Sequence, residues 1–372
     1  MSLSGDKGYD DLNLYIDDYL KNYKNYKTYW NYEDGCVLKG MLDLYRVNGS
    51  QKYLDFISCY LDRCITEDGT IITYEPQKNN VDNINCGKVL FYMYDYTKNE
   101  KYHTAISFLA QQIKKQPRIT CGNFWHKDIY PGQVWLDGLY MLQPFYMEYE
   151  LKFNNGLNTD DIISQFMNVR KYMFDENKKL YYHAYDDDRS QFWADSCTGL
   201  SRNFWLRSIG WFMMALADTI ELLAVFNKPV QSLSEIFTEA ADGIVQYQDK
   251  KTKLFYQIVD DPDYTGNYTE TSGSLMISYS FMKGAALGVL APDYAHNGAG
   301  IFDSVINDKL IFRDSKMYLT DICLSAGLGF DPERDGSKDY YLSTSRVDDD
   351  AKGTGVLMMA YAQRIMYREV SD

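Results

Sequence analysis

The 372-residue chain carries 52 acidic and 38 basic side chains, and its formal net charge at pH 7 is −14. Nucleic-acid binding is not expected, because contacts with phosphates require a basic stripe on the surface. No run of about eighteen apolar residues occurs, so we expect no membrane span. The first residues, MSLSGDKGYDDLNL, lack the apolar core of a signal peptide, so we expect no leader in this sequence.

Seven cysteines and four histidines restrict the metal and redox chemistry available to the protein. The cysteine count is odd, and the sequence contains neither a C-x-x-C pair nor an H-E-x-x-H motif. We therefore expect no metal and no cofactor. Unpaired cysteines are typical of a reducing compartment, which predicts a cytoplasmic protein.

Helical periodicity dominates the chain, with apolar residues recurring at three- and four-residue steps. It predicts twelve helices, over residues 9–25, 34–47, 51–65, 83–97, 101–115, 134–152, 159–175, 204–225, 231–248, 271–289, 297–310 and 353–368. Turn residues separate these segments. Two apolar and aromatic runs between helices are typical of small hairpin strands, TIITY (70–74) and KLYYHAY (179–185).

No linker and no change in composition divides the chain, so we expect one domain over residues 1–372. Twelve helices favour six antiparallel hairpins that close into a toroid, because an open row leaves two apolar faces uncovered. The expected fold class is therefore all-α, an (α/α)6 toroid. An open solenoid of helical repeats is the alternative, although the helices begin at intervals too uneven for a strict repeat.

The most informative motifs stand at the beginning of every second helix. They are WNYEDG (30–35), VDNINCG (81–87), QVWLDG (133–138), FWLRSIGW (204–211), NYTETSGS (267–274) and VDDDAKG (347–353). The intervening helices begin with no comparable motif. In a closed toroid the inner helices run parallel, so these six motifs would meet at one mouth and form one site.

Two aspartates are candidates for acid catalysis. Asp137 in QVWLDG follows a Trp-Leu pair and precedes a glycine, so it is either a helix N-cap or a general acid. Asp82 in VDNINCG supplies a second carboxylate just before a helix. Two carboxylates that face one cavity favour different protonation states, as acid catalysis at neutral pH requires.

Three further side chains are candidates for substrate contact. His183 interrupts an aromatic run, and it is either structural or a hydrogen-bond donor to a substrate hydroxyl or carboxylate. Arg207 and Trp211 stand four residues apart on one helical face. They form either a packing pair or a guanidinium for a carboxylate beside an indole for a sugar ring. The acidic runs 186–188 and 348–350 are expected to lie in solvated loops.

Nearly the whole chain, from WNYEDG to KGTGVLMMA, resembles glycoside hydrolase family 105, the unsaturated rhamnogalacturonyl hydrolases. The block FWHKDIYPGQVWLDGLYMLQPFY is close to the most typical segment of that family. The other shared motifs occur in the family's order, namely VDNINCGKVL, LYYHAYDDD, FWLRSIGW, ETSGS, ICLSAGLG, RDGS and KGTGV.

The resemblance implies an (α/α)6 toroid that hydrolyses Δ4,5-unsaturated galacturonic acid linked to rhamnose, a product of lyase action on rhamnogalacturonan. It implies Asp137 as the general acid, with catalytic roles for Asp82 and His183. It also implies substrate contacts at Tyr32, His126, Lys127, Trp135, Arg207, Trp211 and Tyr341. In this chemistry the acid protonates C4 of the vinyl ether, water adds at C5, and the hemiketal opens to release the aglycone. Asp137 also acts as base on the water, with Asp82 assisting.

The chain departs from the family at three places. It has Leu206 where the family has a small residue, Tyr185 where it has tryptophan, and Asp349–Asp350 where it has Asn-Asp. The first two concern the aglycone preference rather than the chemistry.

Three other functions are alternatives. An unsaturated glucuronyl hydrolase of family 88, acting on glycosaminoglycan fragments, has the same fold and chemistry. A sugar epimerase on this fold normally needs catalytic histidines, and four histidines in total disfavour it. A non-catalytic toroid that binds sugar or protein is disfavoured by the presence of both Asp82 and Asp137.

Overall fold

All twelve predicted helices are present in the computed structural model, which describes residues 5–24, 27, 29–329 and 334–371. Their ends differ from the predicted ones by a few residues, and α12 is a short additional helix. The α-helices are α1 Gly5–Asn22, α2 Tyr32–Asn48, α3 Gln51–Cys64, α4 Lys88–Thr97, α5 Glu100–Lys115, α6 Leu136–Phe153, α7 Thr159–Met173, α8 Leu206–Val225, α9 Gln231–Ile244, α10 Thr271–Ala286, α11 Pro292–Lys309, α12 Lys338–Ser343 and α13 Ala351–Ser371. The 3-10 helices are η1 Pro76–Lys78, η2 Val81–Gly87 and η3 Val245–Tyr247.

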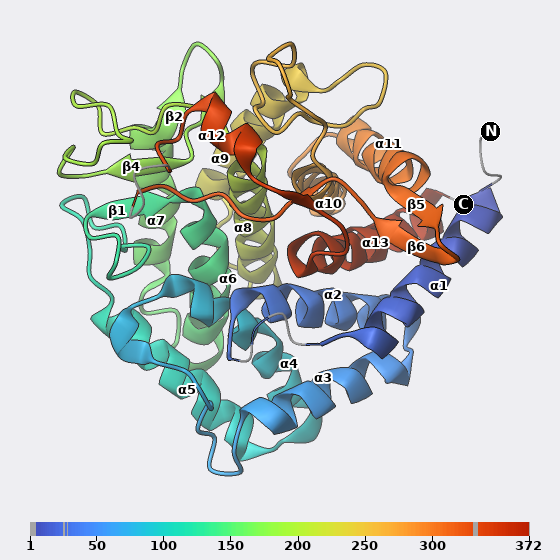
Figure 1. Ribbon diagram of the computed structural model, residues 1–372. Coiled ribbons are helices and arrows are strands. Elements are labelled where there is room, and N and C mark those ends of the chain that lie inside the picture. The colour runs from blue at the N-terminus through green and yellow to red at the C-terminus, as the bar shows by residue number, and fades with distance from the viewer. Residues whose placement is uncertain (1–4, 25–26, 28, 330–333, 372) are drawn as a thin grey trace.

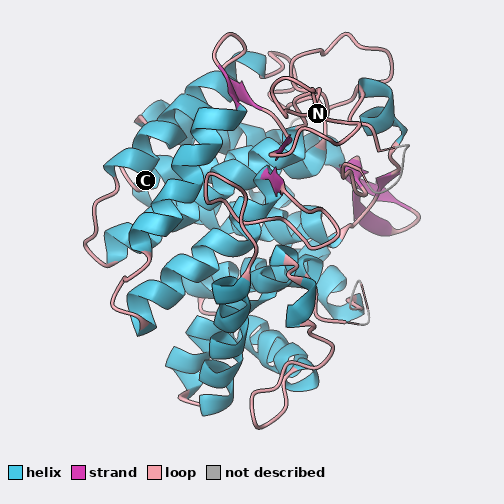
Figure 2. Cartoon of the chain, turned by 90° about the vertical axis from the view of Figure 1, so that its left-hand side faces the viewer, coloured by secondary structure: helices cyan, strands magenta, loops and turns pink. Residues whose placement is uncertain are grey.

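Short strands lie among the connecting loops (Figure 2). In the described part of the chain they form two-stranded antiparallel sheets, in which β1 Gln133–Trp135 pairs with β4 Ala184–Asp186, β2 Phe174–Asp175 with β3 Leu180–Tyr181, β5 Leu310–Arg313 with β6 Lys316–Leu319, and β7 Ile322–Cys323 with β8 Arg346–Val347. The strands expected within KLYYHAY are confirmed as β3 and β4. The prediction for TIITY was wrong, because Ile71 makes only an isolated bridge with Ile65.

Six helices form a closed inner ring in which each one packs against the next (Figure 1). The order is α2, η2 with α4, α6, α8, α10 and α13, and α13 packs back against α2. Five outer helices, α3, α5, α7, α9 and α11, each pack on an inner partner in the same hairpin. The first helix, α1, closes the sixth hairpin through hydrogen bonds from Tyr15 to Thr354 and from Tyr361 to Asn13. The (α/α)6 toroid is therefore confirmed, and an open solenoid is excluded by the contact between α13 and α2.

Hydrophobic patterning explains which helices are inner. Helix α8 is buried on nearly every side, and α10 is buried along most of its length. Outer helices bury only one stripe; α3, for example, buries Tyr53, Leu54, Ile57 and Tyr60 at helical spacing. Helix α8 is long and apolar enough to cross a membrane, but 78% of that apolar window is buried inside the ring. It is the core helix of this toroid.

Neighbouring inner helices run parallel. Leu206 faces Gly273, and Gly210 faces Met276, so α8 and α10 advance together from their N-terminal ends. Gly355 lies against Cys36, and Gly40 lies against Met358, so α13 and α2 also advance in the same direction. Parallel inner helices bring their N-terminal motifs to one mouth, as the sequence predicted.

The acidic runs expected in solvated loops are partly buried instead. Asp350 is only 4% exposed and accepts a hydrogen bond from the backbone of Lys352 at the start of α13. Asp186 is 1% exposed and accepts hydrogen bonds from the backbone N–H groups of Ser190 and Gln191. In each run a carboxylate oxygen of the buried aspartate accepts from backbone donors, and Asp350 also pairs with Lys352 Nζ, whereas Asp186 Oδ1 has no partner among the described residues.

Gly355→Ala should destabilise the closure between α2 and α13. The added methyl group has no space against the backbone at Cys36, so we expect the free energy of unfolding to fall by about 1–3 kcal/mol. Chemical denaturation measures this change. Gly300→Ala in α11 is the matched control, because its new methyl group would meet only the end of the flexible Lys253 side chain. The control should be neutral or stabilising by up to about 1 kcal/mol, and equal losses in both variants would contradict the packing argument.

Candidate active site

A buried carboxylate, Asp82, forms one side of the mouth. It lies in the first turn of η2, where its backbone N–H donates to Asn80. Lys127 Nζ is 2.5 Å from one carboxylate oxygen of Asp82, and His126 Nε2 is 3.4 Å from the other. Burial raises the pKa of Asp82, but attraction to Lys127 and to the other basic groups nearby together more than offsets this, so the pKa lies below its ordinary value. Asp82 is therefore a carboxylate at neutral pH.

His126 connects this carboxylate to an aromatic stack. Its ring lies on Trp135 with centroids 4.6 Å apart, and Tyr130 stacks on Trp135 at the same distance. Burial lowers the pKa of His126 to about 4, although Asp82 and Asp137 both oppose this decrease. The imidazole is therefore neutral at pH 7. Because both aspartates act on its pKa, the ring lies close to both of them.

Asp137 lies in the first turn of α6, but it is not the N-cap. The N-cap residue is Trp135, and no side chain there hydrogen bonds to the helix. Asp137 Oδ2 lies 3.5 Å from His183 Nε2 and has no hydrogen-bond partner among the described residues. The side chain is 15% exposed, so it is partly open to solvent. The capping interpretation of this residue is therefore wrong, and a general acid fits its surroundings.

His183 is held by its backbone and by its other ring nitrogen. The pairing of β1 with β4 places it beside Trp135, and its carbonyl accepts a hydrogen bond from Leu136 N at 3.1 Å. Its Nδ1 lies 2.8 Å from the hydroxyl of Tyr341, a residue 158 positions away in α12. Both His183 and Tyr341 are fully buried. The imidazole therefore has a fixed orientation, with Nε2 facing Asp137.

Arg207 lies on the opposite side of the mouth, at the start of α8. It donates to the carbonyl of Cys323 and to Ser272 Oγ, and its guanidinium lies 5.1 Å from the centre of the Trp205 ring. The expected aromatic neighbour was Trp211, but that ring stacks on Tyr140 at 4.8 Å. Burial lowers the pKa of Arg207, and nearby acidic groups more than offset this, so it stays charged. Among the described residues no carboxylate lies within salt-bridge distance of it.

Tyr32, the first residue of α2, lies between these two sides. Burial raises the pKa of its hydroxyl, Asp82 raises it further, and Arg207 opposes the increase. The predicted residues Tyr32, Asp82, His126, Lys127, Trp135, Asp137, His183, Arg207 and Tyr341 thus come together at one mouth. Trp211 lies one turn further along α8 and is 1% exposed, so stacking on a sugar would require its ring to be uncovered.

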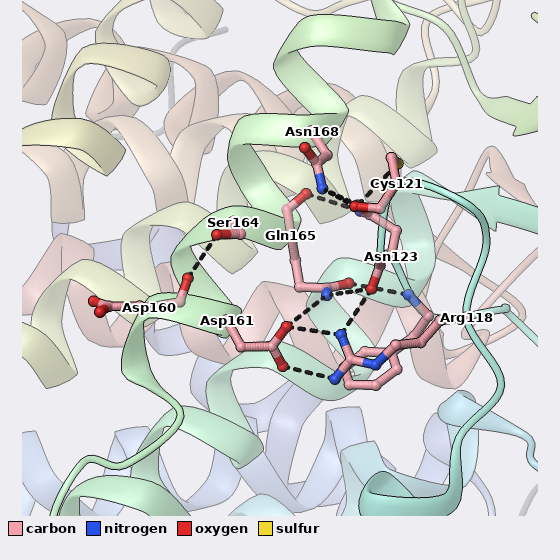
Figure 3. A network of polar contacts seen from close by, with 10 residues as sticks. Arg118, Cys121, Asn123, Asp160, Asp161, Ser164, Gln165 and Asn168 are labelled. Atoms are coloured by element: carbon pink, nitrogen blue, oxygen red, sulfur yellow. Dashed lines mark hydrogen bonds and ion pairs between the residues drawn. The ribbon is translucent and has the colours of Figure 1, made fainter.

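The loop that carries His126 and Lys127 is clamped to α7 (Figure 3). Arg118 makes a two-point ion pair with Asp161, at 2.7 and 2.8 Å. Gln165 accepts from the backbone N–H of Phe124 at 3.1 Å and donates to the carbonyl of Gly122 at 3.0 Å. These contacts join an outer helix to the loop, so the outer layer fixes the position of His126 and Lys127.

Sequence reasoning missed Glu270 and Trp205. Glu270 is fully buried, accepts hydrogen bonds from the first turn of α10 and from Cys323 N, and lies close enough to raise the pKa of Arg207. It belongs to the motif NYTETSGS, so the motif was the available signal. Trp205 precedes Arg207 in FWLRSIGW and packs on both His183 and Tyr341.

Three other observations delimit the site. In the described part of the chain no cluster of histidine, cysteine, aspartate or glutamate is arranged to hold a metal. A surface depression of about 760 Å³ lies against α9, and none of the predicted site residues lines it. Two of the departures from the family are buried, since Leu206 is 0% and Tyr185 is 6% exposed.

The sequence matches the family model described as Glycosyl Hydrolase Family 88 over residues 13–368. The solved structure of a family 105 glycoside hydrolase from C. acetobutylicum ATCC 824 is 38% identical in sequence to this chain, with a TM-score of 0.91. The comparison covers 96% of this chain and 99% of that chain. The unsaturated rhamnogalacturonyl hydrolase YesR of Bacillus subtilis (strain 168) is 26% identical over 299 residues, which are 77% of this chain and 79% of that protein.

A more distant structure has the same fold. The unsaturated glucuronyl hydrolase from Bacillus sp. GL1, responsible for the degradation of glycosaminoglycan, is 14% identical with a TM-score of 0.67. The comparison covers 98% of this chain and 97% of that one. At this identity the likeness concerns the toroid alone.

Lys127→Met should leave Asp82 buried without its nearest cation. We expect the free energy of unfolding at pH 7 to fall by about 1–3 kcal/mol, because the carboxylate loses its charged donor. The native pKa of Asp82 is depressed, so the lost stability is present above the unfolded value of about 3.9 and disappears as the pH falls through the native pKa. Denaturation at several pH values should show the difference from wild type narrowing below about pH 4.

The double variant Lys127→Met/Asp82→Asn is the control for this ion pair. It removes the buried charge as well as its partner, so it should recover most of the stability lost at pH 7. A loss that is the same at every pH, or that the second substitution does not relieve, would contradict the electrostatic explanation.

Proposed function

This chain belongs to glycoside hydrolase family 105, within the family 88 group of unsaturated uronyl hydrolases, and from that membership we propose that it acts on fragments of rhamnogalacturonan. The substrate we propose is Δ4,5-unsaturated galacturonic acid linked to rhamnose. The printed name of YesR supports this choice of substrate, and the mouth of the toroid supports the chemistry.

One observation carries the proposal, namely that two aspartates at the mouth have different surroundings. Asp82 is held as a carboxylate by Lys127, whereas Asp137 faces His183, has no cationic lysine or arginine partner among the described residues, and is partly open to solvent. Acid catalysis at neutral pH requires one group that carries a proton and one that stabilises positive charge. The arrangement supports Asp137 as the acid and Asp82 as its ionised partner.

In the proposed reaction Asp137 donates its proton to C4 of the vinyl ether. Positive charge then develops at C5 and on the ring oxygen, where the Asp82 carboxylate stabilises it. Water adds to C5 and returns a proton to Asp137, so the acid is regenerated. The resulting hemiketal opens to a ketone at C5 and a hemiacetal at C1, and collapse of the hemiacetal breaks the C1–O bond and releases the rhamnose-containing aglycone. The anomeric bond is not attacked directly, so neither retention nor inversion of configuration is defined.

His183 positions the acid in this scheme. Its Nδ1 is engaged by Tyr341, so Nε2 is the nitrogen available to Asp137 or to a substrate hydroxyl. The ring is fully buried between aromatic neighbours and cannot turn without displacing them. A fixed imidazole keeps the acid in one orientation, which favours proton transfer to a single carbon.

Recognition of the anionic sugar requires cations at the mouth, because the protein as a whole is acidic. Lys127 is the more accessible one, with 22% of its side chain exposed. Arg207 is 1% exposed but pairs with no carboxylate in the described residues, so we propose that it meets the uronate carboxylate deeper in the site. Tyr32 and the Trp135 ring supply hydroxyl and stacking contacts beside them, with His126 behind.

The runner-up is hydrolysis of unsaturated glucuronyl groups from glycosaminoglycan fragments. The enzyme of Bacillus sp. GL1 shares the toroid at 14% identity, against 26% for YesR, and this difference favours the rhamnogalacturonan substrate. We also propose a cytoplasmic location. All seven cysteines lie in the described part of the chain and none forms a disulfide, which suits a reducing compartment.

Turnover of lyase-treated rhamnogalacturonan is the experiment that tests this function. Cleavage destroys the unsaturated uronate, so its ultraviolet absorbance should disappear, and rhamnose-containing products should accumulate. Unsaturated chondroitin fragments serve as the comparison substrate at equal concentration. A higher kcat/KM for chondroitin fragments would assign the runner-up function. If the absorbance of neither substrate decreases, both proposed functions are wrong.

Asp137→Asn should abolish most of this turnover without unfolding the protein. A positioned acid contributes roughly 10²–10⁴-fold, and asparagine keeps the shape of the side chain but cannot donate a proton to carbon. The measurement is kcat on the preferred substrate, with thermal unfolding and equilibrium binding as controls for structure. A loss under about tenfold would remove Asp137 from the acid role.

A further inference from the structure

A small cavity lies directly behind His126, on the side away from Asp82. It leaves about 10 Å³ for the centre of a water molecule. Its walls come from α6, from α7 and from the loop 123–126. Gly138 lines it, and a β-carbon there would lie 3.0 Å from His126 Nδ1. The ring nitrogen therefore faces the first turn of α6 at the one position in that turn that has no side chain.

Three buried polar atoms belong to the residues around this cavity and have no hydrogen-bond partner within the described chain. They are His126 Nδ1, Gln143 Oε1 and Trp125 Nε1. His126 and Gln143 are 3% and 2% exposed, so solvent does not satisfy them. An unsatisfied buried polar group costs about 1–3 kcal/mol, and three at one place would be a large destabilisation.

The other polar side chains of the cavity wall are already engaged. Gln165 uses its amide oxygen for Phe124 N and its amide nitrogen for Gly122 O (Figure 3). Asn123 donates to the carbonyl of Gln165 and accepts from Asn168. These groups hold the loop on α7, so they cannot turn to satisfy the three atoms without releasing the clamp.

We propose that one buried water molecule occupies this cavity and bonds to all three atoms, which makes Gln143 and Trp125 positioning residues for His126. The donors and acceptors balance for a single water. It donates one hydrogen to Gln143 Oε1 and the other to His126 Nδ1, and it accepts one from Trp125 Nε1. Buried waters in proteins typically make about three hydrogen bonds, and a space of roughly 10–15 Å³ holds one.

Other occupants fit less well. A metal cation would face the N–H group of Trp125, which is a donor and cannot act as a ligand. A larger solute exceeds the space. Direct contact between the three side chains would require the cavity to collapse, and the clamped loop opposes that.

The water fixes which nitrogen of His126 carries the proton. If Nδ1 accepts from water, then the neutral ring carries its hydrogen on Nε2, which lies 3.4 Å from Asp82 Oδ1. Burial lowers the pKa of His126 to about 4, so the ring is neutral near pH 7 and carries a single hydrogen, on either Nδ1 or Nε2. His126 then donates to the carboxylate that Lys127 also holds. This part of the inference rests on the proposed role of Asp82 in the reaction.

Two measurements on the wild-type protein test the water site without any substrate. A high-resolution crystal structure should show one ordered water within hydrogen-bond distance of the three atoms. Nitrogen-15 NMR of the histidines at pH 7 should show His126 with its hydrogen on Nε2. An empty cavity, or a hydrogen on Nδ1, would overturn the proposal whatever the enzyme hydrolyses.

Gln143→Leu tests the positioning role. It removes one acceptor for the water, so the imidazole loses its fixed orientation. A displacement of about 1 Å costs roughly 10²-fold, so we expect kcat/KM to fall by roughly 10–100-fold. The fall should be in kcat, with KM nearly unchanged, and the Nε2–H tautomer should no longer dominate in the NMR spectrum. Trp125→Phe removes the donor and should act in the same direction if the leucine variant does not fold.

Gln363→Leu in α13 is the matched control, because it removes a buried glutamine from another inner helix. It should change thermal stability by a similar amount and leave kcat/KM within twofold. If Gln143→Leu has the same kcat/KM as this control, the positioning role is overturned. If the wild-type enzyme hydrolyses no unsaturated uronate, the proposed function fails, and the crystal structure and tautomer still decide whether the water is present.

Discussion

Closure of the inner ring is the constraint on which the rest of the structure depends. Six parallel helices can share one mouth only if the last packs against the first, and α13 meets α2 through backbone contact at Gly355 and Cys36. The ring carries residues from distant parts of the sequence to one place, such as His183 and Tyr341, which are 158 positions apart. An open row of the same hairpins would separate these residues, and the N-terminal motifs would not form one site.

The site holds two carboxylates within a protein whose net charge is already negative, and the neighbours of each carboxylate set its charge locally. Asp82 remains ionised despite burial because Lys127 lies 2.5 Å from one of its oxygens and the His126 imidazole lies 3.4 Å from the other. Asp137 has His183 but no lysine or arginine within salt-bridge distance among the described residues, so the two carboxylates differ in surroundings rather than in residue type. Net charge of the whole chain says little about such a site, because solvent and salt screen distant charges while adjacent buried charges interact strongly.

The outer layer also contributes to the chemistry. The loop that carries His126 and Lys127 is held by Arg118, Asp161 and Gln165, and none of these three lies at the mouth. Short strands have a similar role, because β1 and β4 fix the backbone of Trp135 and place His183 opposite Asp137. The precision of the site therefore depends on hydrogen bonds between an outer helix, a loop and a strand pair that sequence patterns do not reveal.

The sequence by itself determined the twelve long helices, their alternation between inner and outer positions, and the motifs at the N-terminal ends of the inner ones. These are local properties, since helical periodicity and helix-terminal residues act over a few turns. The motifs also indicated four of the nine residues that come together at the mouth, and the resemblance to family 105 implied the other five. Tertiary structure alone decided the surroundings of these side chains, with Trp205 rather than Trp211 beside Arg207 and with Asp137 facing His183 rather than capping α6. It also decided the burial of Asp186 and Asp350, in runs that the sequence predicts as solvated loops. The physical reason is that burial and hydrogen bonding depend on which distant surfaces pack together, and a local pattern of residues carries no record of them.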